Sequence, residues 1–291
     1  MEKIQINKLK KKIIVCKDAG AAQIILSYVV KNKINFDAIL EDPAKSLFKK
    51  KIKRYSNISL KSFLNNISSY DEALIGTGVN NFEIKILNKI KNKIKTKSFV
   101  DHWCFYKERF RLKKNKYIYP DKIVAHDEYS YEKLKKIFSK KKVILINNPY
   151  WLEQIKKYKN KNLDKTKNIL ILCSSLTEDH FKLSLVSNFL MKLRSKNYKG
   201  TVILRPHPMD MRKNFKKKFS LLKYINYEIS KSNEIGKDIS RSTYIVGFKT
   251  SSLVLSLKFR KKVFSFHNRR LLKISIPHKK IDNVEEFYKF I

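Results

Sequence analysis

Cysteine, glycine and proline are scarce in this sequence of 291 residues, which contains three, six and six of them respectively. The cysteines, Cys16, Cys104 and Cys173, lie far apart and form no CxxC pair, which argues against a disulfide framework and against a zinc site. No apolar run approaches the ~20 residues that span a bilayer, and no signal-peptide core is evident at the start. We therefore expect a globular protein of the reducing cytoplasm.

Acidic residues are also few. Against 25 of them stand 66 lysines and arginines, which gives a net charge of +41. Such an excess is typical of nucleic-acid-binding proteins. Only ten of the basic residues are arginine, however, and bidentate recognition of bases and phosphates favours arginine. The lysines are spread along the whole chain, so we expect solvated charge and no sequence-specific nucleic-acid partner. Peripheral attraction to an anionic membrane, at its inner face, or to an anionic polysaccharide stays open.

The apolar residues fall in short runs that alternate with helical patterns in both halves of the chain. Strands are expected at 13–16, 36–40, 73–75, 98–100, 122–125 and 143–146, then at 169–173, 201–204, 227–229, 244–246 and 262–266. Helices are expected at 21–30, 60–67, 82–94 and 129–138, then at 178–195, 214–224 and 251–259. This alternation predicts an α/β fold in which crossover helices join parallel strands.

A polar, lysine-rich stretch at 158–168 has no apolar period and separates the two halves. It is typical of a linker between domains. We therefore expect two Rossmann-like domains, 1–157 and 168–291, whose parallel sheets face a cleft.

The turn after the first predicted strand reads CKDAGAAQ. The helix that follows begins with free backbone N–H groups, which suit an anion or a developing charge. Asp18 has two interpretations: it caps this helix, or its carboxylate faces the cleft as a general base. Gly20 permits either a turn that requires a positive φ or the close approach of a ligand.

Another predicted strand runs into the sequence SFVDHWCFYKERF. Asp101 and His102 place a carboxylate beside an imidazole, a pair that can carry acid–base chemistry near neutral pH. The alternative is structural: Trp103, Phe105 and Phe110 belong to the core, and Asp101 caps a helix.

The strand at 201–204 ends in the sequence RPHP. Proline has no backbone N–H and disfavours helical geometry in the residue before it. His207, between Pro206 and Pro208, is therefore expected in a stiff elbow at the carboxyl end of a strand. In open α/β sheets, ligands bind at that edge.

The strand at 244–246 ends at Gly247, and Thr250, Ser251 and Ser252 then open an apolar helix. Hydroxyl and free N–H groups at a helix start either cradle a phosphate or simply cap the helix. The sequence CSSLTEDH offers a similar set of hydroxyls, for which capping is the first interpretation, on Ser174, Ser175 and Thr177.

The RPHP strand end, followed about 40 residues later by a strand, a glycine and TSS, resembles the carboxyl-terminal half of GT-B glycosyltransferases. It is most similar to bacterial sialyltransferases and polysialyltransferases, which carry an HP motif and a Ser/Thr-Ser motif. The CDP-glycerol glycerophosphotransferases carry a similar His-Pro and Ser-Ser pair. The resemblance implies a metal-independent transferase without a cofactor. It would move a sugar from a nucleotide-activated donor, CMP- or CDP-linked, to a glycan or lipid-linked acceptor in surface polysaccharide synthesis.

By the same resemblance, domain 168–291 binds the nucleotide sugar and domain 1–157 binds the acceptor. The donor-binding residues would be Arg205, His207, Gly247, Thr250, Ser251 and Ser252, with His207 on the donor phosphate as a catalytic group. Asp18 or Asp101 would act as the base, with Gly20 and His102 at the acceptor.

Two other functions fit the sequence. A nucleotide-sugar epimerase of the same architecture would need clustered carboxylates and histidines and no acceptor. A basic module that binds nucleic acid or an anionic membrane would need arginines and aromatic residues gathered on one face.

Overall fold

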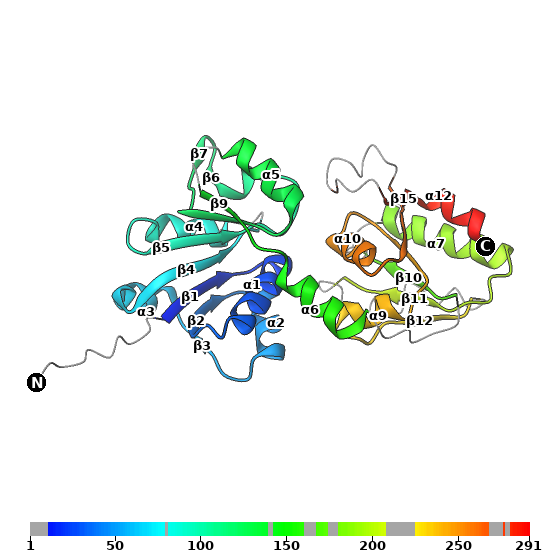
Figure 1. Ribbon diagram of the computed structural model, residues 1–291, viewed down its shortest axis with the longest axis horizontal. Helices are drawn as coiled ribbons and strands as arrows, with labels where there is room; N and C mark the ends of the chain where they lie inside the picture. Colours follow the sequence, from blue (N-terminus) through cyan, green and yellow to red (C-terminus); the bar gives the residue numbers. More distant parts are fainter. Residues whose placement is uncertain are drawn as a thin grey trace, which may run out of the picture. The chain divides into compact units, whose positions relative to one another are not determined.

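The computed structural model describes residues 11–78, 81–138, 142–159, 167–173, 180–207, 225–267, 276 and 280–291. The chain divides into two compact units, Met1–Tyr150 (unit 1) and Trp151–Ile291 (unit 2) (Figure 1). Each unit has its own parallel sheet. The α/β class with two parallel sheets, expected from the alternation of strands and helices, is therefore confirmed.

Unit 1 is built on a seven-stranded parallel sheet in the order β3-β2-β1-β4-β5-β8-β9. Its strands are β1 (Lys11–Cys16), β2 (Phe36–Leu40), β3 (Ser56–Asn57), β4 (Tyr70–Gly76), β5 (Lys95–Phe99), β8 (Lys122–Ala125) and β9 (Lys142–Leu145). Side chains alternate across the sheet, so Ile13 and Val15 of β1 enter one core while Ile14 and Cys16 enter the other. A strand buried on both faces reads as a continuous apolar run, which is why β1 stood out in the sequence.

Helices cover both faces of this sheet. Those packed on the Ile14 face are α1 (Ala19–Lys31) and α2 (Ala44–Lys51), and those on the Ile13 face are α3 (Leu60–Asn65), α4 (Phe82–Ile90) and α5 (Glu128–Ile137) (Figure 1). The remaining elements are the 3-10 turns η1 (Ile67–Ser69) and η2 (Glu108–Phe110) and a separate hairpin of β6 (Arg111–Lys113) and β7 (Lys116–Tyr117).

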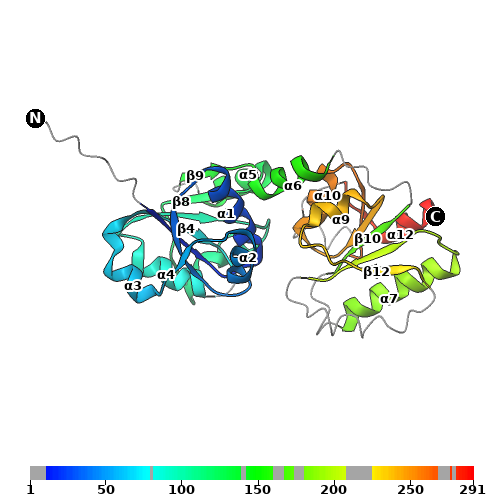
Figure 2. The ribbon, with the colours of Figure 1, turned by 90° about the horizontal axis from the view of Figure 1, so that it is seen from below.

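Unit 2 contains a six-stranded parallel sheet in the order β12-β11-β10-β13-β14-β15. Its strands are β10 (Ile169–Leu172), β11 (Val202–Arg205), β12 (Tyr227–Ile229), β13 (Tyr244–Gly247), β14 (Lys262–Ser265) and β15 (Asp282–Asn283). Its helices are α7 (His180–Ser195), α9 (Ile235–Ser240), α10 (Ser251–Lys258), α12 (Val284–Phe287) and the 3-10 turn η3 (Tyr288–Phe290), together with most of α6 (Pro149–Tyr158), whose first two residues belong to unit 1. Figure 2 shows α7 on one side of this sheet and α9 and α10 on the other.

The division between the units falls before the stretch expected as a linker. Helix α6 packs with unit 2, because the side chain of Gln154 accepts a hydrogen bond from the Gly236 N–H of α9 at 2.9 Å and Lys157 pairs with Glu234 at 2.7 Å. Most of the expected linker, residues 160–166, lies outside the described residues, as does the helix expected at 214–224.

Within the described ranges, no helix is both long and apolar enough to cross a membrane.

Candidate active site

The carboxyl ends of three neighbouring strands, β1, β4 and β5, carry a group of buried polar side chains in unit 1. β1 is the point at which the order of strands reverses, since β2 lies on one side of it and β4 on the other. Open α/β sheets bind ligands at such a reversal, outside the carboxyl ends of the strands. The loops that follow these three strands are therefore the first place to look for chemistry.

Asp18 follows β1 and is the N-cap of α1. Its Oδ1 accepts hydrogen bonds from the backbone N–H of Gly20 at 2.8 Å and of Ala21 at 3.3 Å. Its carboxyl group also hydrogen-bonds the side chain of Asp101. Burial, and then the charge and hydrogen bond of Asp101, raise the pKa of Asp18 to about 6. The capping interpretation of Asp18 is therefore confirmed, and its raised pKa is compatible with the other interpretation, that of a general base, which stays a prediction.

Position 20 requires glycine because the side chain of Asp101 lies against it. A Cβ atom built on Gly20 would lie 2.2 Å from Asp101 Oδ2 and 3.3 Å from Asp18 Oδ1. No described glycine has a positive φ, so the first of the two interpretations of Gly20, a turn of positive φ, is wrong. The carboxylate of Asp101 fills the space that a side chain would need.

Arg109 holds Asp101 from the other side. Its Nη1 lies 2.7 Å from Asp101 Oδ1, and the two side chains are only 7% and 13% exposed. The same guanidinium donates to the backbone oxygen of Thr77, after β4, and its Nε donates to the backbone oxygen of Cys104 at 3.2 Å. One arginine therefore fastens together the loops that follow β4 and β5.

A third carboxyl group, that of Glu83, lies behind the pair. Glu83 stands in the first turn of α4 and is 3% exposed. Its Oε1 accepts from the backbone N–H of Lys17 at 2.8 Å and of Asp18 at 3.4 Å, whereas its Oε2 is buried without a partner in the described structure. Burial raises the pKa of Glu83. Glu83 thus fixes the backbone that carries Asp18.

His102 does not pair with Asp101. Its Nδ1 lies 3.4 Å from Cys104 Sγ, and burial, with the charge of Arg109, lowers the pKa of His102 to about 4. The expected acid–base pairing of these neighbours is therefore replaced by the Asp18–Asp101 pair, and His102 is neutral at pH 7. Asp101 caps no helix, and Trp103 and Phe110 are buried as expected. Phe105 is not a core residue, because it is 60% exposed and has a φ of 57°.

The predicted donor residues lie at the carboxyl edge of the second sheet, in unit 2. Arg205 of β11 and Gly247 of β13 are both in register with Leu172 of β10, which lies between them. The RPHP segment and the start of α10 are thus two strands apart rather than adjacent. His207, half-buried, follows β11 directly.

The start of α10 combines a tight glycine with a hydroxyl cap. Thr250 Oγ1 accepts from the Ser252 N–H at 3.3 Å, so Thr250 is the N-cap, and Ser251 and Ser252 form the first turn. A Cβ atom on Gly247 would lie 3.0 Å from the Leu172 Cβ. Gly247 is therefore explained by close packing against β10, and the cap leaves the hydroxyl groups of the first turn at the sheet edge.

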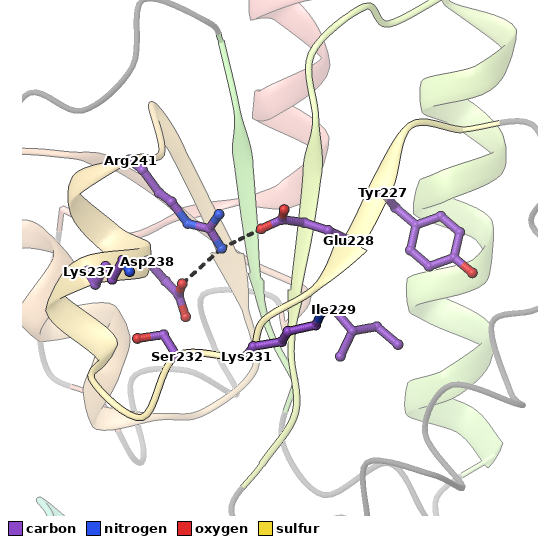
Figure 3. A pocket seen from close by; sticks show the side chains of 8 residues that line it. All are labelled: Tyr227, Glu228, Ile229, Lys231, Ser232, Lys237, Asp238 and Arg241. Atoms are coloured by element: carbon purple, nitrogen blue, oxygen red, sulfur yellow. Dashed lines mark hydrogen bonds and ion pairs between the residues drawn. The ribbon is translucent and has the colours of Figure 1, made fainter.

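Arg205 points toward α9. Its Nη1 pairs with Asp238, which is fully buried and also receives the hydroxyl of Ser230, and Arg241 approaches Asp238 at 3.0 Å. Figure 3 shows this carboxylate at a pocket of about 620 Å³ between β12 and α9. The guanidinium of Arg205 therefore holds α9 against the sheet.

The structure thus brings Asp18, Gly20 and Asp101 into contact, with His102 in the same loop as Asp101. The hydroxyls of CSSLTEDH lie outside the described residues. Sequence reasoning placed Arg109 in its motif without a role and did not single out Thr77 or Glu83. An arginine eight residues after the aspartate was the one available signal, since arginine is rare in this chain. No group of side chains in the described ranges is arranged to hold a metal ion.

No protein-family model matches this chain, and no curated protein matches it by sequence. Solved structures do match. The UDP-GlcNAc 2-epimerase from Neisseria meningitidis bound to UDP-GlcNAc is 16% identical, with a TM-score of 0.65 over 96% of this chain and 91% of that one. The E. coli heptosyltransferase WaaC with ADP-2-deoxy-2-fluoro heptose is 9% identical, with a TM-score of 0.51 over 96% and 99%. MurG of Acinetobacter baumannii is 10% identical, with a TM-score of 0.54 over 87% and 76%.

At such identities the likeness concerns the fold alone. The fold is of the GT-B type, as the RPHP and TSS motifs led us to expect. The particular likeness to sialyltransferases and glycerophosphotransferases stays a prediction.

Proposed function

We propose that this protein is a glycosyltransferase that moves a sugar from a nucleotide-activated donor to a glycan or lipid-linked acceptor in surface polysaccharide synthesis. The observation that carries the proposal is the buried Asp18–Asp101 pair at the carboxyl edge of the first sheet. A carboxyl group with a pKa of about 6 is ionised at pH 7 and still basic enough to accept a proton. Structures of similar fold bound to UDP-GlcNAc and to an ADP-heptose analogue support a nucleotide sugar as the ligand class.

In the proposed reaction the pair removes the proton of an acceptor hydroxyl while its oxygen bonds to the anomeric carbon of the donor sugar. The bond from that carbon to the phosphate oxygen breaks, and the nucleotide leaves with the electron pair. Negative charge grows on the phosphate, so a donor group fixed there stabilises the transition state more than the ground state. We assign that role to His207, with Ser251, Ser252 and the start of α10 as further phosphate contacts.

Thermal-shift measurements with CMP, CDP and UDP show which nucleotide the protein binds. Ligand at 100 times its Kd stabilises the protein by about 2.7 kcal/mol. His207→Ala should weaken nucleotide binding and slow transfer by about 10²-fold, by analogy with the loss of one oxyanion donor. His102→Ala is the matched control, because it removes a half-buried histidine from unit 1 and should leave nucleotide binding intact. Normal nucleotide binding by His207→Ala, in a variant that melts early, would assign His207 a structural role.

A nucleotide-sugar epimerase is the second candidate, and one observation favours it. Glu83 adds a third buried carboxyl group beside the pair, and His102 interacts electrostatically with Asp18 and with a second histidine, His126. Epimerisation moves a proton off a carbon and back onto its other face, which needs both a base and an acid.

Proton NMR in D2O separates the two candidates. An epimerase incubated with UDP-, CMP- or CDP-sugars alone produces a second diastereomer that carries deuterium at the inverted carbon and keeps its nucleotide. A transferase gives no diastereomer and releases nucleotide when acceptor glycans are added.

A further inference from the structure

We propose that Arg109 is a positioning residue that keeps Asp101 as the anion of the carboxyl pair, so that the single shared proton resides on Asp18. Asp18 loses that proton as the pH rises past about 6, so at pH 7 it is the general base, and Asp101 is the fixed negative charge beside it. This inference rests on the proposed function for its catalytic meaning, but the location of the proton does not depend on any activity.

The contacts of the two carboxyl groups are unequal. Asp101 Oδ1 faces the full positive charge of Arg109 at 2.7 Å, in a place where both side chains are largely removed from water. Asp18 meets no cation among the described residues: its Oδ1 accepts from backbone N–H groups at 2.8 and 3.3 Å, and its one side-chain hydrogen bond is to Asp101. A full charge stabilises an anion more than peptide dipoles do, and two carboxylates in hydrogen-bonding contact resist double ionisation. The proton therefore belongs on the carboxyl group that lacks the cation.

The surroundings of Asp18 favour the same assignment. Among the described residues, the titratable groups that interact with Asp18 are Cys16 of β1, Glu83 of α4, and Asp101 and His102 of the loop after β5, and Arg109 joins this group through its ion pair with Asp101. His102 and Cys16 are neutral at pH 7, because burial lowers the pKa of His102 and raises that of Cys16. Arg109 is the one cation of this group, and it is bound to Asp101.

The position of Arg109 is also fixed independently of the pair. Its guanidinium donates to the backbone oxygen atoms of Thr77 and Cys104. These two oxygen atoms keep the positive charge of Arg109 beside Asp101 whether the shared proton is on Asp18 or on Asp101. Arg109 thus sets the basicity of Asp18 without a contact to it.

Carbon-13 NMR of the full-length protein, with labelled aspartate carboxyl carbons, tests the assignment. Asp18→Asn and Asp101→Asn identify the two resonances. We expect the proton to be taken up by the Asp18 carboxyl, with a midpoint near pH 6. A wild-type Asp101 resonance that titrates near pH 6, with Asp18 ionised, would overturn the proposal without any further variant.

Arg109 is tested by charge. Arg109→Gln should let Asp101 take up the proton and raise the upper midpoint of the pair, whereas Arg109→Lys keeps the charge and should leave the order of titration as in the wild type. Arg111→Gln is the matched control, because Arg111 is exposed on β6 and should change nothing. Unchanged titration in a folded Arg109→Gln variant would also overturn the proposal.

Kinetics separate this inference from the proposed function. If the protein is a transferase, Asp18→Asn should reduce kcat/KM by about 10²–10⁴-fold at every pH. Asp101→Asn should stay active and move the acidic limb of the pH profile downward. Loss of all activity in Asp101→Asn, with activity kept in Asp18→Asn, reverses the roles and contradicts the inference. Absence of transfer by the wild type, with the predicted carboxyl titrations, refutes the function alone.

Discussion

Gly20 shows at the scale of one residue how closely the carboxyl pair is packed. Alanine is normally the better helix residue, by up to about 1 kcal/mol. Here a Cβ atom would overlap Asp101 Oδ2 at 2.2 Å, so Gly20→Ala should displace that carboxylate, lower the melting temperature and abolish the near-neutral titration of Asp18. Differential scanning calorimetry and the carboxyl NMR titration measure both effects.

The control for this prediction is the Asp101→Ala background. With the carboxylate removed, Gly20→Ala should become neutral or stabilising, so that the two substitutions are strongly non-additive. Additive effects would mean that alanine at Gly20 disturbs something other than Asp101.

At the scale of the element, the N-cap of helix α1 is Asp18, whose ionisation lowers the stability of the folded protein. The pKa of Asp18 is about 6 in the folded protein, against an ordinary value of 3.8 for an exposed aspartate. Between about pH 4 and 6 the folded protein therefore holds a proton that the unfolded chain has lost, and wild-type stability falls as the pH rises through this window. Asn keeps the capping oxygen and cannot ionise.

Asp18→Asn should consequently raise the free energy of unfolding at pH 7 by ~2–3 kcal/mol, since one pKa unit corresponds to about 1.4 kcal/mol. Urea unfolding at pH 7 and pH 4 measures this gain, which should shrink toward zero at the lower pH. A gain of equal size at both values would point to a better cap rather than to a removed charge.

The elements also show what the sequence predicts well. Strands at 36–40, 122–125 and 227–229 have the predicted bounds. β2 and β8 are largely buried, and buried parallel strands are mostly apolar runs, whereas the three residues of β12 are only partly buried. Helices α2, α6, α9 and α12 were not predicted. α9 is six residues long with a glycine inside it, and it is held by tertiary contacts with α6 and with Arg205 of β11 rather than by a local pattern. α6 starts at Pro149, and proline is favourable as the first residue of a helix, so this start could have been predicted from the sequence.

The candidate site likewise contains residues that the sequence can predict and residues that it cannot. Asp18 and Asp101 follow parallel strands, whose carboxyl ends share one edge, so their proximity could be predicted from the order of the motifs. Arg109 and Glu83 come from a 3-10 turn and a helix, and only tertiary packing decides where their side chains lie. The same holds for Phe105, whose aromatic character suggested burial while its backbone turns the ring outward.

At the scale of the whole molecule, each unit has its own sheet, its own core and one of the two tryptophans. Trp103 is buried in unit 1 and Trp151 in unit 2. The variant Trp151→Phe therefore keeps a fluorescent reporter in unit 1 only, and Trp103→Phe keeps one in unit 2 only. We expect CMP, CDP or UDP, whichever binds, to raise the thermal midpoint reported by Trp151, in the unit that carries His207 and α10. The thermal midpoint reported by Trp103 should rise as well only if the two units unfold in one cooperative transition. A shift confined to Trp103 would place the nucleotide in unit 1.

The contact between Gly20 and Asp101 also has a consequence for descent. Alanine is excluded at Gly20 only while the carboxylate occupies the space, and helix propensity favours alanine as soon as that space is empty. Lineages that lose the acid should therefore lose the glycine soon afterwards, whereas the reverse order passes through a clash. Paired changes at these two positions would mark the branches on which the carboxyl pair, and the chemistry that depends on it, was abandoned.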